Sequence, residues 1–377
     1  MNKPRLHVVH LVSGDQWAGA EVMVNHLLAQ LSRQRADIDV TAICLNEGQL
    51  TQKLRSADVE VCVVPEKKLS FPRIVMAALR ALKGRPAHVL HSHRYKEHLL
   101  GTTIAASRVS RLLATVHGLP EPARVRQPGF ALQNRVADRL LRHRFDAIAA
   151  VSEALRADLI TQRGLPGSKI RVVPNGIPIV PSDVIQPLRP DVQHIGSVGR
   201  LVPVKRFDLF LEMAAAIHRV YPQMRFSVLG GGPDEALLTD RAARLGLSAH
   251  FSIAPPVQEP WHYYRSLDLY VNTSESEGLP LSILEAMTMC IPVVASAVGG
   301  IPEVIVDGVD GFLIKGSNAG DYAARCLQLI ADRGERERIG GRARDRVSKS
   351  YSAQEMAARY CEMYSELTVG GASGGPS

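Results

Sequence analysis

A proline-rich stretch, PNGIPIVPSDVIQPLRPD at residues 174–191, divides this sequence into two halves that share one pattern. The stretch holds five prolines. Proline lacks a backbone N–H and cannot continue a helix or a central strand. The stretch therefore predicts a linker between two domains, which we place at residues 178–193.

Short apolar runs alternate with helical patterns on both sides of this linker. Before it the runs lie at 6–12, 38–45, 59–65, 88–93, 112–118, 147–153 and 170–176, and after it at 194–199, 226–232, 250–255, 267–274, 291–300 and 310–314. Runs that are apolar on both faces and separated by helices indicate parallel sheets covered by helices. The predicted fold class is α/β, with two Rossmann-like, doubly wound domains facing a central cleft.

The domain boundaries follow from this pattern. We expect an N-terminal domain at 1–177 and a C-terminal domain at 194–350, followed by a terminal helix at 351–368. The tail VGGASGGPS, at 369–377, has no large side chain to bury and is expected to be disordered.

Composition predicts a cytoplasmic protein. Of the 377 residues 46% are hydrophobic, and no apolar run is long enough for a signal peptide or a membrane span. The five cysteines lack C-x-x-C spacing. Those in AICL, VCVV and MCIP are expected to be small buried side chains, which suits a reducing compartment.

The charge is concentrated in the first half. Residues 1–177 hold 26 Lys and Arg against 14 Asp and Glu, whereas the remainder holds 19 against 23. The stretch 124–144 has Ala131, Leu132, Val136, Leu140 and Leu141 at helical spacing, flanked by arginines. It predicts a helix that lies on an anionic membrane surface, or an ordinary solvated helix. Because no aromatic residues are interleaved there, nucleic acid is the weaker expectation.

A second stretch, SESEGLPLSILEAM at 274–287, predicts a ligand site after a strand. Pro280 suits a first helical position, and the amides that follow offer unpaired N–H groups to an anion. Gly278 allows close approach. Glu277 and Glu285 can accept hydrogen bonds from sugar or ribose hydroxyls. A phosphate and a polyol together describe a nucleotide sugar.

This stretch resembles the signature of the retaining glycosyltransferases of family 4, which have the GT-B fold. Further segments resemble motifs of that family in the same order, namely WAGAE, TVHG, VSE, VPNGI, VGRLVPVK, VLGGGP and GGIPEVIVDGVDGFL. The resemblance covers nearly the whole chain. It implies that the terminal helix crosses back to brace the first domain.

The resemblance also implies roles for individual residues. Arg200 and Lys205 would grip the donor diphosphate, Glu285 the ribose, and Glu277 the donor sugar or the charge at its reacting carbon. Gly19 and Gly230 would approach the donor closely, although Ala18 stands where the family usually has another glycine. His117 would lie beside the donor sugar. Gly278, Leu279, Pro280 and Leu281 complete the substrate-binding set, in which His117 and Glu277 are the catalytic candidates.

Other motifs are expected to carry no chemistry. His91 and His93 could be two metal ligands, but they lack a carboxylate or cysteine at useful spacing and are interpreted as polar loop residues. The D-x-D of Asp37 and Asp39 precedes a strand, which is the wrong end for a ligand site. We expect no required metal and no other cofactor.

The predicted function is transfer of a sugar from a nucleotide-diphosphate sugar to a hydroxyl of a glycan or lipid-linked acceptor, with retention. By analogy, a basic first domain suggests bacterial surface polysaccharide or lipopolysaccharide synthesis at the inner face of the cytoplasmic membrane. A uridine and a guanosine donor both stay open. So do a nucleotide-sugar epimerase or hydrolase of the same fold and a non-catalytic binding subunit.

Overall fold

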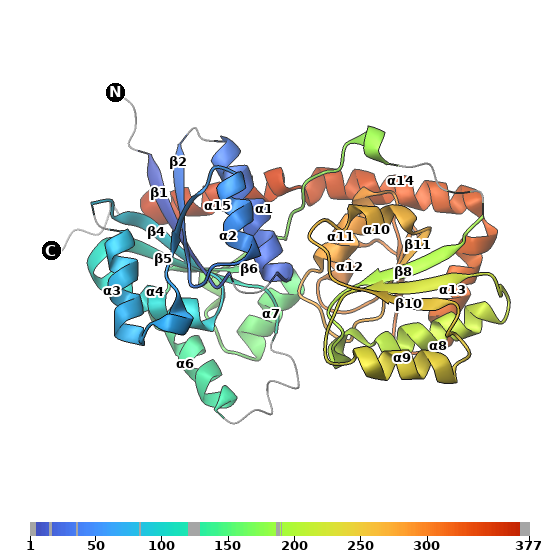
Figure 1. Cartoon of the computed structure of the whole chain (residues 1–377). Coiled ribbons are helices and arrows are strands. Elements are labelled where there is room, and N and C mark those ends of the chain that lie inside the picture. The colour runs from blue at the N-terminus through green and yellow to red at the C-terminus, as the bar shows by residue number, and fades with distance from the viewer. Residues whose placement is uncertain are drawn as a thin grey trace. The chain divides into compact units, whose positions relative to one another are not determined.

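The computed structural model describes residues 5–14, 17–34, 37–82, 84–119, 129–185, 189 and 191–369. These residues form two compact units (Figure 1). Unit 1 comprises the chain up to Pro178 and the segment that begins at Ala353, and unit 2 runs from Ile179 to Ser352. The division falls inside the proline-rich stretch. The end of the expected tail, 370–377, lies outside the described residues.

Unit 1 is built on a seven-stranded parallel sheet with the order β3-β2-β1-β4-β5-β6-β7. Its strands are β1 (Leu6–Val12), β2 (Ile38–Cys44), β3 (Glu60–Val63), β4 (Ala87–Ser92), β5 (Val109–Val116), β6 (Ala147–Ala150) and β7 (Ile170–Val172). Its helices are α1 (Gly19–Gln34), α2 (Gln49–Ser56), α3 (Phe71–Ala81), α4 (Tyr95–Arg108), α6 (Phe130–His143), α7 (Glu153–Thr161) and α15 (Ala353–Val369). Helix α15 packs on α1, β4 and β5, so the C-terminal helix is part of this unit.

Unit 2 has a six-stranded parallel sheet with the order β10-β9-β8-β11-β12-β13. Its strands are β8 (His194–Val198), β9 (Arg225–Leu229), β10 (Phe251–Ala254), β11 (Leu269–Asn272), β12 (Val293–Ser296) and β13 (Phe312–Ile314). Its helices are α8 (Phe207–His218), α9 (Glu235–Arg244), α10 (Trp261–Ser266), α11 (Leu281–Thr288), α12 (Ile301–Val304), α13 (Ala319–Ala331) and α14 (Arg333–Ser350). In Figure 1, α10 and α11 lie on one side of these strands and α8 and α9 on the other.

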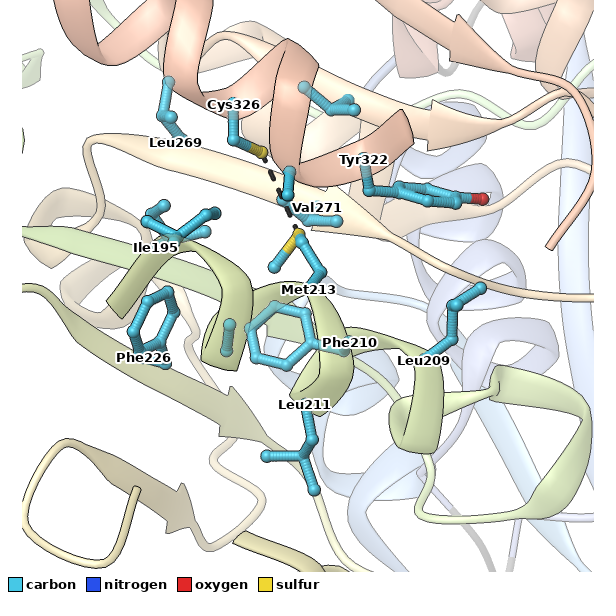
Figure 2. Packing of buried hydrophobic residues seen from close by; sticks show 14 of the residues in the cluster. Ile195, Leu209, Phe210, Leu211, Met213, Phe226, Leu269, Val271, Tyr322 and Cys326 are labelled. Carbon is cyan, nitrogen blue, oxygen red and sulfur yellow. Dashed lines mark hydrogen bonds between the residues drawn. The ribbon is translucent and has the colours of Figure 1, made fainter. Parts of the chain in front are cut away.

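The core of unit 2 explains why its strands are apolar on both faces. Helices α8 and α13 cover one face, where Met213 packs against Cys326 with 3.9 Å between the sulfur atoms (Figure 2). Phe210 and strand residues such as Ile195 and Val271 are fully buried in the same cluster. Each fully buried side chain of this size stabilises the fold by about 1.5–3 kcal/mol.

All thirteen strands expected from the sequence are present, which confirms the two parallel-sheet Rossmann-like domains. The cysteine expectation holds only in part. Cys44 is buried, whereas Cys62 and Cys290 are half-buried, and all five thiols are free.

Helix α6 differs from the expected amphipathic helix. Residues 124–128 lie outside the described residues, and the helix begins at Phe130. It packs on α4 and buries Ala137 and Leu141, while Leu132 is 66% exposed. The buried stripe is therefore narrower than the sequence pattern, and part of the apolar face is open to solvent. Within the described residues, no helix is long and apolar enough to cross a membrane.

Candidate active site

The strand order of unit 2 has a switch point between β8 and β11, and sheets of this type bind ligands beyond the carboxyl ends of the strands at such a point. The chain leaves β8 towards β9 on one side, whereas β11 leads to β12 on the other. Such a switch point separates the two loops that follow the neighbouring strands and so opens a crevice between them. Here those loops carry Arg200 and Lys205 after β8, and Glu277 after β11.

Three hydrogen bonds fix the side chain of Glu277 at this switch point. Its Oε1 accepts hydrogen bonds from Lys205 Nζ at 2.6 Å, Ser274 Oγ at 2.6 Å and Asn272 Nδ2 at 3.3 Å. The side chain of Glu277 is only 9% exposed, and that of Lys205 is 19% exposed. Because the three contacts converge on Oε1, Oε2 is the oxygen that can accept a hydrogen bond from a ligand.

Hydrogen bonds to the loop after β8 and a close approach of Gly299 fix the Glu277 loop on both sides. Thr273 Oγ1 donates to the carbonyls of Lys205 and Arg206, at 3.1 and 2.9 Å, and the Glu275 amide donates to the Val204 carbonyl at 2.8 Å. Gly299 has φ +53°, and a Cβ there would lie 1.8 Å from the Glu277 carbonyl oxygen. Only glycine fits so close to this loop.

Gly230 is required for the packing of two loops of unit 2, independently of any ligand. A Cβ on Gly230 would lie 1.9 Å from the carbonyl oxygen of Gly199, and one on Gly232 would lie 2.4 Å from that of Leu201. The Leu201 amide also donates to the Gly231 carbonyl at 3.0 Å. The glycine-rich loop after β9 thus supports the loop after β8, which is a structural reason for Gly230. Its contact with a donor stays a prediction.

The second glutamate, Glu285, is more buried than Glu277. It is 8% exposed, and its Oε2 accepts a hydrogen bond from the hydroxyl of Tyr264 at 2.7 Å. Burial raises the pKa of Glu285 to about 7, although the hydrogen bond from Tyr264 opposes this shift. Glu285 is therefore a carboxyl group that changes charge near neutral pH.

The start of α11 is one residue later than expected. Pro280 has φ −74° and ψ 123°, which is extended backbone, so Pro280 is the N-cap and Leu281 the first helical residue. The side chains of Leu279 and Leu281 are buried, at 4% and 8% exposure. The carbonyl of Gly278 accepts a hydrogen bond from the Gly300 amide at 2.9 Å, which fixes the chain before the helix.

Arg200 is exposed, in contrast to Lys205. It follows β8 by two residues, at the carboxyl edge of the sheet. A guanidinium can donate two parallel hydrogen bonds to a phosphate, which suits this position to an anionic ligand.

Two predicted site residues, Gly19 and His117, belong to unit 1. Gly19 is the first residue of α1, and a Cβ added there meets no described atom within 4 Å. His117 directly follows β5 and is half-buried, with Nε2 3.3 Å from His93 Nδ1. Burial lowers the pKa of His117 to about 3, so its ring is neutral at physiological pH.

The interpretation of His91 and His93 as polar loop residues is wrong. His91 lies inside β4 and is fully buried, and His93 is 5% exposed. His10 of β1 joins them, and a ring nitrogen of each of the three lies within 4.8 Å of the others. The sequence could not show this third histidine, because the parallel pairing of β1 with β4 brings His10 beside His91, which lies 81 positions further along the chain. Asp39, by contrast, is at the amino end of β2 and pairs with Arg5 and Arg85.

Four residues that support the two glutamates were not predicted from the sequence. Asn272 and Ser274 bond Glu277, Tyr264 bonds Glu285, and Thr273 ties the Glu277 loop to the loop after β8. Asn272, Thr273 and Ser274 immediately follow a predicted strand, which was a usable signal. Tyr264 lies on another helix, α10, and its contact with Glu285 depends on tertiary packing.

Comparison with known proteins identifies the family. Residues 17–180 match the family profile described as Glycosyltransferase Family 4, and residues 183–346 match Glycosyl transferases group 1. A D-inositol 3-phosphate glycosyltransferase of Geodermatophilus obscurus is 31% identical over 318 residues, which are 72% of this chain and 69% of that protein.

The chain belongs to glycosyltransferase family 4.

Two further proteins are similar to this family 4 member over nearly its whole length. The alpha-maltose-1-phosphate synthase of Mycolicibacterium smegmatis is 28% identical over 391 residues, which cover 94% of this chain and 96% of that protein. The crystal structure of Anabaena HepE in complex with UDP-glucose has a TM-score of 0.82 at 21% identity and covers 96% of this chain and all of HepE. The fold is GT-B, and the chain is a glycosyltransferase.

Proposed function

We propose that this glycosyltransferase moves a hexose from a uridine diphosphate sugar to an acceptor hydroxyl with retention of the anomeric configuration. The observation that carries the proposal is Glu277, held by Lys205, Ser274 and Asn272 at the switch point of the unit 2 sheet. Structures of HepE with UDP and with UDP-glucose support the choice of uridine.

In unit 2, Arg200 and Lys205 are proposed to bind the diphosphate. Fixed cations stabilise the negative charge that develops on a departing diphosphate. The amides at the start of α11 add hydrogen-bond donors to the same anion. Glu277 offers Oε2 to a hydroxyl of the sugar, and Glu285 offers its carboxylate to the ribose.

In unit 1, Gly19 and His117 are proposed to contact the donor. The open space at Gly19 leaves the start of α1 accessible to a ligand phosphate. His117 is neutral and can therefore form a hydrogen bond with a sugar hydroxyl without adding charge.

The proposed reaction has a simple course. The bond between the sugar and the diphosphate loosens to an oxocarbenium-like state, and the acceptor hydroxyl attacks the same face. The departing phosphate oxygen takes the hydroxyl proton, so no separate side chain is required as base. This mechanism uses no metal.

The proposed acceptor is a glycan or lipid-linked glycan of a bacterial surface polysaccharide or lipopolysaccharide. The names of the relatives point to a second candidate, because they include an inositol 3-phosphate glycosyltransferase and a maltose-1-phosphate synthase. A phosphorylated polyol or sugar is anionic. The excess of 12 basic residues in 1–177 suits either an anionic glycan or a phosphorylated acceptor.

A transfer assay tests this proposal. The protein is incubated with UDP-glucose and, in parallel, with a lipid-linked glycan mixture or with inositol phosphate, and the anomeric proton of the product is observed by NMR. We expect an α-linked product from the α-configured donor. A β-linked product contradicts retention, and release of free glucose that is unchanged by every acceptor contradicts transfer.

A matched pair of variants links the activity to the site. We expect Glu277→Gln to lower kcat by about 10²–10³-fold, because it removes the charge that pairs with Lys205 and faces the sugar. The control is Glu275→Gln, which alters an exposed glutamate in the same loop. Equal activity in the two variants would reject the role of Glu277.

A further inference from the structure

Seven polar side chains of unit 1 form one hydrogen-bonded chain that ends at His117. Tyr360 and Tyr364 come from α15, His10 from β1, His91 from β4 and Thr115 from β5, while His93 and His117 directly follow β4 and β5. Apart from the half-buried His117, each of them is at most 5% exposed. The chain therefore runs through the interior from the C-terminal helix to a candidate catalytic residue.

The contacts are continuous. The Tyr360 hydroxyl lies 2.8 Å from Thr115 Oγ1, which lies 2.7 Å from His91 Nε2. His91 Nδ1 is 2.8 Å from the Tyr364 hydroxyl, and that hydroxyl is 3.2 Å from His10 Nε2.

The chain then passes from ring to ring. His10 Nδ1 lies 3.1 Å from His93 Nε2, and His93 Nδ1 lies 3.3 Å from His117 Nε2. The His10 and His93 rings are stacked, as are those of His93 and His117.

The hydrogen atoms of this chain can be assigned. Each neutral imidazole carries one hydrogen and accepts one, whereas a hydroxyl carries one hydrogen and can accept two. If all six contacts are hydrogen bonds, one of the seven hydrogens is left over, and it lies either on His117 Nδ1 or on the hydroxyl of Tyr360, Thr115 or Tyr364. Burial keeps the rings neutral, since it lowers the pKa of His10 to about 3 and those of His91 and His93 well below the usual value.

The burial of the three hydroxyls decides where the leftover hydrogen lies. Tyr360, Thr115 and Tyr364 are fully buried, and among the described residues their hydroxyls contact only members of the chain. A leftover hydrogen on one of these hydroxyls would be buried without an acceptor, which is costly. If the donors all point away from Tyr360, the unused hydrogen lies on His117 Nδ1, where solvent or a ligand can accept it.

We propose that this chain holds His117 in the Nδ1–H tautomer, and that Tyr364 is a positioning residue which transmits this constraint from α15. His117 then presents a donor rather than a lone pair. A sugar hydroxyl that accepts this hydrogen bond keeps its own hydrogen for another partner. The consequence for catalysis rests on the proposed function, whereas the tautomer itself does not.

A metal ion bound by His10, His91 and His93 is the alternative for the same cluster. Both ring nitrogens of each histidine already have a partner in the chain. An ion would have to replace several of these contacts in a buried place where the nearest groups are neutral. The hydrogen-bonded chain therefore explains the cluster better.

Histidine tautomers in the full-length protein test the proposal. Long-range ¹H–¹⁵N NMR of protein labelled at histidine reports which ring nitrogen carries the hydrogen, and His117→Gln assigns the signal. We expect His117 to be the Nδ1–H tautomer. In Tyr364→Phe, which keeps the ring but removes the hydroxyl between His91 and His10, we expect both tautomers.

The control variant is Ser92→Ala. This variant removes a buried hydroxyl from β4, the strand that carries His91. The Ser92 hydroxyl lies 2.8 Å from His98 Nδ1 and is not part of the hydrogen-bonded chain. The His117 signals should stay unchanged in this variant. The proposal is overturned by an Nε2–H tautomer in the wild type, by an unchanged tautomer in Tyr364→Phe, or by stoichiometric Zn²⁺ in the purified protein whose chelation shifts these signals.

Kinetics separate positioning from a purely structural role. We expect Tyr364→Phe to lower kcat by about tenfold or more with little change in the KM for the donor, because a misplaced contact acts on the reacting geometry. If Tyr364→Phe and Ser92→Ala have equal kcat, the positioning role is rejected. If the wild type transfers no sugar at all, the proposed function fails, and the NMR result still decides the tautomer.

Discussion

At the scale of single residues, the two predicted glycines Gly19 and Gly230 should respond differently to substitution. A methyl group at Gly230 meets the Gly199 carbonyl at 1.9 Å, whereas one at Gly19 meets no described atom within 4 Å. We expect Gly230→Ala to lower the free energy of unfolding by about 1–3 kcal/mol. Gly19→Ala should leave stability almost unchanged and weaken donor binding.

Thermal unfolding and calorimetric titration with UDP-glucose measure these two effects. The comparison contains its own control, since each variant serves as the reference for the other. A destabilised Gly19→Ala protein would show that Gly19 has a structural role. Unchanged donor affinity in that variant would show that Gly19 does not contact the donor.

Glu285 should make donor binding depend on pH. Its pKa of about 7 is raised by burial, and ribose hydroxyls are bound better by the charged carboxylate. Affinity for UDP-glucose should therefore rise by up to about tenfold per pH unit below pH 7 and level off above it. The diphosphate diester of UDP-glucose keeps its charge over this range.

The matched variant is Glu285→Gln, which cannot titrate. Calorimetric titrations between pH 6 and pH 8 should show a pH-dependent affinity for the wild type and a flat profile for the variant. The same slope in both proteins would exclude Glu285 as the titrating group.

At the scale of elements, the sequence predicted all thirteen strands because strands buried on both faces form continuous apolar runs. The start of α11 was predicted one residue early, because proline suits both the first helical position and the position before it. The partners of Glu277 and Glu285 could not be predicted, since they depend on which loops the sheet order brings together. For the same reason, the sequence did not reveal that His10 lies beside His91 and His93.

We propose that helix α6 contacts an anionic membrane surface. Leu132 is 66% exposed, and Arg135 and Arg139 are exposed on the same helix. A basic helix with an exposed leucine is suited to anionic lipid. We expect the protein to sediment with vesicles that contain phosphatidylglycerol and not with purely zwitterionic vesicles.

The variants Leu132→Ser and Arg135→Glu should both weaken this association, and Leu132→Ser should weaken it at high salt as well. A control is Leu237→Ser, which alters another exposed leucine, 61% exposed, on α9 of unit 2. If the Leu132 and Leu237 variants bind vesicles equally, α6 is not the contact surface.

At the scale of the whole molecule, the histidines of unit 1 should make that unit sensitive to acid. Burial lowers the pKa of His10, His98 and His117 to about 3, and those of His91 and His93 well below 6.5. These rings are neutral when folded and take up protons on unfolding below pH 6.5. Each one therefore contributes stability that is present above pH 6.5 and is lost as the pH drops below it.

Differential scanning calorimetry between pH 7 and pH 4.5 measures this loss. We expect the transition of unit 1 to move to lower temperature more steeply than that of unit 2. Glu285 acts in the opposite direction in unit 2, because its raised pKa costs stability as the pH rises from 4.5 to 7. Parallel shifts of both transitions would contradict the burial of neutral histidines in unit 1.

We expect the switch point of unit 2 to bind the diphosphate of a nucleotide sugar between Arg200, Lys205 and the start of α11. A crystal structure of the complex with UDP-glucose would decide this. The diphosphate should lie on these groups, the glucose against Glu277 and the ribose against Glu285. A donor bound elsewhere, or a diphosphate that contacts neither Arg200 nor Lys205, would rule out this site.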